Sequence, residues 1–180
     1  IRGPDMTDSP AQTKLGRKEL AMRRRARLAA VQALYQIDLV GVEPEQAVAE
    51  LLGRQDQAPK LDESHLARLA DGTAADLEAI DVVIGERLSA DWPIERLSVT
   101  ARALLRVATF ELQACDDIPA RVVVSEYVDI ARGFFDEAET GFVNGVLDGL
   151  ARHVRSDEMG AGEADAMRGG RDNGNGETPG

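Results

Sequence analysis

The chain has 180 residues, of which 43% are hydrophobic, and it carries a formal net charge of −11. This length suits one globular domain or two small ones. The sequence has no apolar run near the roughly 18 residues of a membrane span and no hydrophobic signal segment at its start, so we predict a cytoplasmic protein without membrane contact. A single cysteine, Cys115, excludes internal disulfides and cysteine-based zinc sites, and we expect it to be a small buried hydrophobic residue.

Apolar residues recur at three- and four-residue intervals along most of the chain, which predicts helices and almost no strand. The predicted helices cover residues 19–39, 46–55, 64–90 with a bend or cap near Asp71-Gly72, a segment capped by Ser98 or Thr100 and closed at Asp116-Asp117, 119–135 and 139–154. We therefore predict an all-α fold of two small packed helical bundles, at 14–90 and 91–155, that meet near Trp92-Pro93. The two ends, 1–13 and 156–180, lack an apolar period, and we expect them to be disordered.

Basic side chains concentrate in one short segment. Residues 14–27 hold seven of the 21 Lys and Arg side chains against one acid, whereas residues 28–180 carry 13 basic and 29 acidic side chains. The long acidic part would repel a polyanion, so the basic segment is the one place that is suited to receive it. The alternative is a frayed basic terminus that only improves solubility.

The orientation of this segment is unusual for a helix. Projection at about 100° per residue puts Arg23, Arg24 and Arg27 on the same side as the apolar stripe that follows them. Because a charge cannot be buried there unpaired, we expect the first turns of the helix to overhang the core. The positive end of the helix dipole also disfavours cations, and an incoming phosphate would relieve both problems.

The last predicted helix combines an apolar stripe with regularly spaced glycines. The stripe consists of Val143, Val146, Leu147, Leu150 and Val154. Gly141, Gly145 and Gly149 lie on another face, and three glycines inside a helix indicate that another helix or a ligand approaches closely. Phe142 and Asn144 lie on opposite margins of the stripe.

Catalytic motifs are scarce in the sequence. His65 and His153 lie far apart without a metal-ligand spacing, and we expect both at the surface, on helix ends. The chain has no P-loop, dinucleotide fingerprint or nucleophile elbow. We therefore predict a protein that is not an enzyme and that uses no metal or cofactor.

Two blocks of residues resemble the bacterial transcription antitermination factor family NusB. The first is Arg23-Arg24-Arg25-Ala26-Arg27 with Ala30-Val31-Gln32-Ala33-Leu34-Tyr35. The second is Arg102-Ala103-Leu104-Leu105-Arg106, Glu111-Leu112, Asp117-Ile118-Pro119 and Phe142-Val143-Asn144-Gly145-Val146-Leu147-Asp148. The resemblance spans residues 20–152, although 41–90 match only in helical character.

This resemblance implies a function and a set of binding residues. NusB proteins have two helical subdomains, pair with NusE, a basic small-subunit ribosomal protein, and bind single-stranded boxA RNA. They act in antitermination complexes with RNA polymerase during ribosomal RNA transcription. The implied RNA-binding residues are Arg23, Arg24, Arg25 and Arg27, with Lys14 and Lys18 as weaker candidates and Tyr35, Arg106, Phe142 and Asn144 near the RNA surface. Tyr35 and Phe142 would stack on bases and Asn144 would read a base edge, but each also suits a structural role.

The chain departs from the family pattern at three places: Ala101, Ser125-Glu126-Tyr127 and Ala138-Glu139-Thr140-Gly141. A usual lysine is missing from the last of these and Glu139 is added, so we expect weaker phosphate contacts there and a larger share for the arginines. The alternative function is a helical protein-interaction module without sequence-specific RNA binding.

Overall fold

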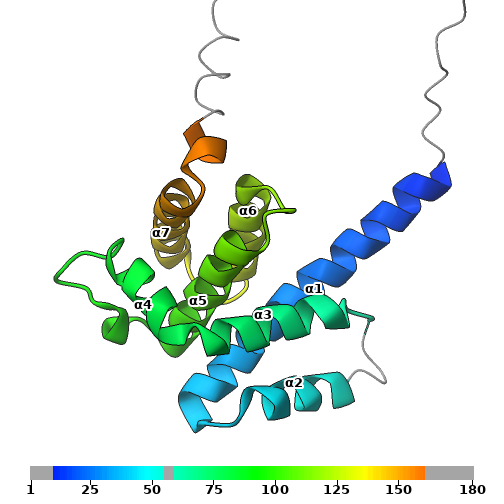
Figure 1. Cartoon of the computed structure of the whole chain (residues 1–180), viewed down its shortest axis with the longest axis horizontal. Helices are drawn as coiled ribbons and strands as arrows, with labels where there is room; N and C mark the ends of the chain where they lie inside the picture. Colours follow the sequence, from blue (N-terminus) through cyan, green and yellow to red (C-terminus); the bar gives the residue numbers. More distant parts are fainter. Residues whose placement is uncertain (1–9, 55–58, 161–180) are drawn as a thin grey trace, which may run out of the picture.

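The computed structural model describes residues 10–54 and 59–160, and the side chains of residues 16–54 and 59–160 (Figure 1). The described part is helical and contains no strand, which confirms the all-α prediction. Its elements are α1 (Pro10–Val40), α2 (Pro44–Gly53), α3 (Glu63–Ala75), α4 (Leu77–Gly85), the short 3₁₀ helix η2 (Ile94–Arg96), α5 (Val99–Ala114), α6 (Ala120–Ala131) and α7 (Glu137–Val154).

Local sequence signals explain most helix ends. Gly41 ends α1 with a φ of 73°, a left-handed conformation that glycine adopts without strain. Ser98 caps α5, because its Oγ accepts a hydrogen bond from the backbone N–H of Ala101 at 3.2 Å. Asp136 caps α7 in the same way, through the N–H of Glu139 at 2.8 Å. These caps fix where the helices begin, and Ser98 was one of the two predicted caps.

The central element is α5, against which α1, α3, α4, α6 and α7 all pack. Eleven of its 16 residues are buried, so it forms the middle of the core instead of presenting one apolar stripe. The buried residues of both predicted bundles form one hydrophobic cluster. Cys115 belongs to this cluster, as predicted. The boundary between subdomains at residue 90 stays a prediction.

The N-terminal part of α1 extends beyond the other helices (Figure 1). This helix begins at Pro10, earlier than the predicted residue 19. The described helices include residues 10–13 and 156–160, where Met159 is buried, so helix extends past the inner bounds predicted for the two tails. The rest of the two predicted tails, 1–9 and 161–180, lies outside the described residues.

The structure bears on two predictions made from glycine positions. The predicted helix 64–90 breaks at Asp76, between α3 and α4, and not near Asp71-Gly72. Gly72 lies within α3, where the ring of Phe110 packs against the helix. A methyl group on Gly72 would lie 2.0 Å from Phe110 Cζ. A methyl group on Gly141 or Gly145 would meet no atom of the described residues within 4 Å, and one on Gly149 would lie 3.9 Å from Arg87 Cδ. Among the described residues no helix approaches these glycines closely, and the approach of a ligand stays a prediction.

Candidate nucleic-acid interface

Arg24 of α1 is held by two carboxylates of α6. Its Nε and Nη2 donate to the two oxygens of Glu126 at 2.9 and 2.8 Å, and Nη2 also donates to Asp129 Oδ2 at 3.2 Å. The hydrogen bond and the charge of Glu126 raise the pKa of Arg24 above its usual value. The side chain is still 54% exposed, so the guanidinium faces solvent while it is paired.

Arg27, one turn further along α1, is buried, which contradicts the expected overhang at this position. Its side chain is 3% exposed and its Nε and Nη2 donate to Glu111 of α5, with the shortest contact at 2.7 Å. The hydroxyl of Tyr127 on α6 donates to the same carboxylate at 2.7 Å. A buried arginine is tolerated here because a buried acid, which sequence periodicity does not reveal, neutralises it. In this arrangement Arg27 does not offer its charge to a ligand.

The charge state of Glu111 follows from these neighbours. Burial by itself would raise the pKa of this carboxyl group, but the imidazole of His65 and the hydrogen bonds from Arg27 and Tyr127 lower it to about 2. The Nε2 atom of His65 lies 3.3 Å from Glu111 Oε1, although without hydrogen-bond geometry. His65 is 7% exposed, so its predicted surface position is wrong. Its place beside an acid in the core gives it a structural role.

The other cations of the basic segment lie closer to solvent. Arg23 is 3.8 Å from Asp62, an ion pair in which both side chains are partly exposed. Arg25 Nη1 donates to the backbone carbonyl of Lys60 at 2.7 Å, and no carboxylate pairs with it among the described side chains. Lys18 is exposed and likewise has no ion pair among them. Lys14 lies in α1, but its side chain is outside the described set.

Arg106 is in the interior of the fold. It is 6% exposed, forms two hydrogen bonds of 2.7 Å with Asp81 of α4, and lies 3.2 Å from Asp38 of α1. Desolvation would lower the pKa of Arg106, but the hydrogen bonds and charges of these two acids raise it above its usual value. Arg106 therefore joins three helices and, like Arg27, does not present its charge at the surface.

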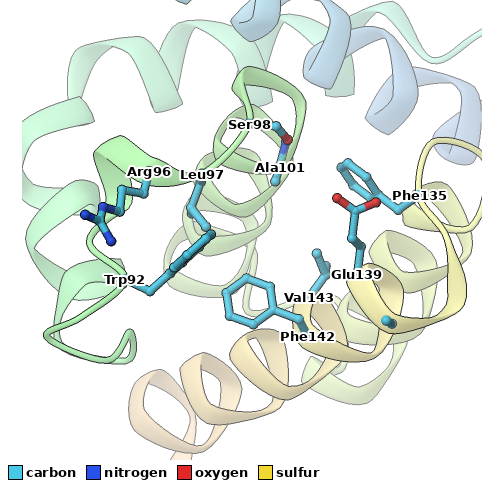
Figure 2. A pocket seen from close by; sticks show the side chains of 10 residues that line it. Trp92, Arg96, Leu97, Ser98, Ala101, Phe135, Glu139, Phe142 and Val143 are labelled. Carbon is cyan, nitrogen blue, oxygen red and sulfur yellow. The ribbon is translucent and has the colours of Figure 1, made fainter.

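Phe142 and Asn144 open onto different hollows on either side of α7. Phe142 is 41% exposed and lines a hollow of about 630 Å³ with Trp92, Leu97 and Phe135. In Figure 2 the Phe142 ring and the Trp92 ring border this hollow together, from α7 and from the segment before η2. Tyr35, 37% exposed, lies in a third hollow on α1. A single ligand strand must curve around α7 to reach both Phe142 and Asn144.

The hollow beside Asn144 contains cations that sequence reasoning missed. It lies between α6 and α7 and is lined by Arg121, Ser125, Asp129, Arg132, Asn144 and Asp148, among others. Asp129 joins it to the basic segment, since this carboxylate pairs with both Arg24 and Arg132. Arg121 lies in the first turn of α6 and Arg132 directly follows its last residue; both are exposed and about three helical turns apart, a spacing that helical projection would have placed on one face.

The described residues hold no group of three or more His, Cys, Asp or Glu side chains that is arranged to bind a metal ion. None of the described helices combines the length and the apolar composition that a membrane crossing requires. The fold and the site therefore define a helical protein with an exposed basic surface on α1, next to a mixed-charge hollow on α6 and α7.

Comparisons with known proteins identify the family. Residues 24–152 match the model of the NusB family. The transcription antitermination protein NusB of Bradyrhizobium diazoefficiens is 43% identical over 155 residues, which cover 82% of this chain and 94% of that protein. NusB of Caulobacter vibrioides is 43% identical over 137 residues, 72% of this chain and 92% of that protein. The chain belongs to the NusB family, as its motifs predicted.

Solved structures agree with this assignment. T. maritima NusB has a TM-score of 0.67 and 35% identity, covering 77% of this chain and 96% of that chain. The NusB of a complex of the antitermination factors NusB and NusE with double-stranded RNA has a TM-score of 0.67 and 29% identity, covering 74% of this chain and 98% of that chain. The family consists of transcription antitermination factors, so the chain is one of these and not an enzyme.

Proposed function

We propose that this chain is an RNA-binding adaptor that pairs with NusE and binds boxA RNA during ribosomal RNA transcription in the cytoplasm. Its partners would be NusE, single-stranded boxA RNA and the antitermination complex with RNA polymerase. The similarity to a NusB that is in complex with NusE and RNA supports the two direct partners. The observation that carries the proposal is the exposed basic surface of α1 in a chain with a net charge of −11.

The predicted RNA-binding residues differ in how available their charge is to a ligand. Lys18 and Arg25 lie two turns apart on one side of α1, and neither has a carboxylate partner among the described side chains. We propose that these two residues make the principal phosphate contacts, with Lys14 on the same side of the helix. Arg23 and Arg24 would contribute after exchange of their exposed ion pairs.

The path of the RNA would continue from α1 over α6 to α7. Arg121 and Arg132 provide exposed cations along α6, and Asn144 at the end of this path offers an amide that can read a base edge. The exposed rings of Phe142 and Tyr35 would stack on bases or contact the protein partner. Arg27 and Arg106 would support the surface from below, because both are buried and paired.

The mechanism is assembly without a chemical step. The acidic part of the chain attracts the basic NusE, and the pair forms a composite surface that binds RNA more tightly than either protein alone. Because the effect of one ligand on another is reciprocal, RNA must tighten the protein pair by the same factor.

Fluorescence anisotropy of labelled boxA RNA tests the proposal. The full chain is titrated alone and with NusE, at two salt concentrations, with a scrambled RNA as control. We expect tighter and sequence-selective binding in the presence of NusE. Weak and unselective binding in every case would support the alternative, a helical protein-interaction module.

A pair of variants tests the basic surface itself. Arg25→Ala should weaken RNA binding and reduce the slope of log affinity against log salt by about 0.7, the value for one phosphate contact to a single strand. Arg87→Ala, an equal change of charge on the exposed side of the turn after α4, is the matched control and should leave the RNA affinity nearly unchanged. Equal effects of both variants would contradict a localised site.

A further inference from the structure

The ion pair between α1 and α6 occupies an arginine of the proposed RNA surface. Glu126 accepts two parallel hydrogen bonds from Arg24, at 2.8 and 2.9 Å, which is the geometry in which arginine also binds a phosphate. Asp129 adds a third oxygen at 3.2 Å. In the chain without RNA, the Nε and Nη2 atoms of Arg24 are therefore already hydrogen-bonded to carboxylate oxygens.

The surroundings of Arg24 lower the free-energy cost of exchanging its carboxylate partners for a phosphate. Arg24 is 54% exposed, so a phosphate can approach it from solvent. Both carboxylates keep a cation when Arg24 leaves, because Glu126 lies 3.6 Å from Arg27 Nη1 and Asp129 pairs with Arg132. Neither acid would be left without a counter-charge, and the pair is open to solvent on the Arg24 side, so its loss costs less than the loss of a buried pair.

The neighbouring cations of α1 differ from Arg24 in their electrostatic surroundings. Lys18 and Arg25 have no carboxylate partner among the described side chains, so an approaching phosphate meets their full charge. Arg24 lies on the same helix, but its charge is compensated by two acids from another helix. Replacing a carboxylate by a phosphate on Arg24 gives a smaller gain than binding a phosphate to an unpaired arginine.

We propose that Glu126 and Asp129 lower the RNA affinity of the chain by holding Arg24 in an intramolecular pair with which an RNA phosphate must compete. The two acids act as positioning residues: they hold Arg24 over α6, next to the hollow that contains Asn144, and they lower its contribution to unselective binding. This inference rests on the proposed RNA binding of the basic surface.

The direct test measures RNA affinity and its salt dependence for Glu126→Gln in the full chain. The substitution keeps the size of the side chain and removes its charge, so Arg24 becomes available to phosphate. We expect binding of the labelled boxA RNA to tighten by about two- to fivefold, the range for an exposed ion pair. The slope of log affinity against log salt should steepen by up to about 0.7.

A second variant covers the case in which Glu126→Gln disturbs the neighbouring Arg27. Asp129→Asn removes one of the two negative charges that hold Arg24 and should tighten binding by a smaller factor, because the bidentate contact with Glu126 remains. Asp148→Asn is the matched control: it removes one negative charge from the same hollow, where Asp148 pairs with Arg152 and not with Arg24. Melting curves verify that each variant is folded.

Repeating the substitutions in an Arg24→Ala background separates the proposed exchange from a general loss of negative charge. If the acids act through Arg24, Glu126→Gln and Asp129→Asn no longer tighten binding in that background. Equal tightening in both backgrounds, or tightening by Asp148→Asn to the same degree, would overturn the inference.

The outcomes also separate this inference from the proposed function. If the unmodified chain shows no salt-sensitive RNA binding, with or without NusE, the proposed function itself fails. If the chain binds RNA and Arg25→Ala weakens the binding, but neither acid variant changes it, only the role of the two acids is refuted.

Discussion

The variant Glu111→Gln tests whether a buried ion pair fixes the arginine-bearing helix to the core. Glu111 is fully buried, and Arg27 and Tyr127 donate hydrogen bonds to it from α1 and α6. Gln has nearly the same shape but no charge, so the buried guanidinium of Arg27 would lose its closest counter-charge. The amide would also place an N–H where the carboxylate accepts hydrogen bonds.

Two independent estimates give the size of the effect. The pKa of Glu111 falls from 4.5 to about 2 on folding, which corresponds to roughly 3 kcal/mol of favourable interaction with the ionised form. Removal of one partner of a buried ion pair typically costs about 3–5 kcal/mol. We therefore expect a loss of about 3 kcal/mol in the free energy of unfolding and a melting temperature lower by roughly 10 °C.

Urea unfolding followed by circular dichroism measures this difference. The control Asp148→Asn breaks an exposed pair within α7 and should cost less than about 1 kcal/mol. The double variant Arg27→Met/Glu111→Gln removes both charges of this buried pair, so it should be more stable than Glu111→Gln alone. A free energy of unfolding for Glu111→Gln within about 1 kcal/mol of the unmodified chain would refute the reasoning, as would a double variant that is less stable than both single variants.

The remaining predictions concern acid stability and two glycines. Folding lowers the pKa of Glu111 from its usual 4.5 to about 2, so the stabilisation by its ionised form is present above about pH 4.5 and is lost as the pH falls towards 2. The free energy of unfolding should therefore depend less on pH in this window for Glu111→Gln than for the unmodified chain, and equal slopes would contradict the assignment. Gly72→Ala should destabilise the fold, since the added methyl would lie 2.0 Å from Phe110 Cζ, and a melting temperature equal to that of the unmodified chain would contradict this packing. Gly145→Ala should raise the free energy of unfolding by about 0.5–1 kcal/mol, because the helix gains propensity and the methyl meets no atom within 4 Å; a lower melting temperature would show that something approaches α7 there.

Local sequence patterns correctly predicted the start of α5 and the buried face of α7. Ser98 ends the loop before α5 because its hydroxyl satisfies a free backbone N–H, a contact within one turn of the chain. The apolar stripe of α7 is buried as its spacing predicted, with Val143, Leu147 and Leu150 at 1%, 0% and 0% exposure. Both signals depend only on residues close in sequence, so the chain alone reveals them.

The sequence predicted less accurately those features that depend on contacts with residues far away in the chain. Helical projection correctly placed Arg27 on the core side of α1, but the acid that neutralises it lies 84 residues away on α5. The same difficulty applies to Gly72 and Gly145, because the need for a glycine depends on which ring or helix packs beside it. Spacing within α7 gave no information about that neighbour.

The sequence by itself determined the helical class, the family and the concentration of positive charge near the start of the chain, because composition, periodicity and contiguous motifs express these properties locally. Only the tertiary structure decided which of those charges are available. Packing of α1 against α5 and α6 buries Arg27 on Glu111 and pairs Arg24 with Glu126, and it leaves Arg25 without a carboxylate partner among the described side chains. The physical reason is that the electrostatic state of a side chain depends on the groups that folding brings within a few ångströms, whatever their distance along the chain.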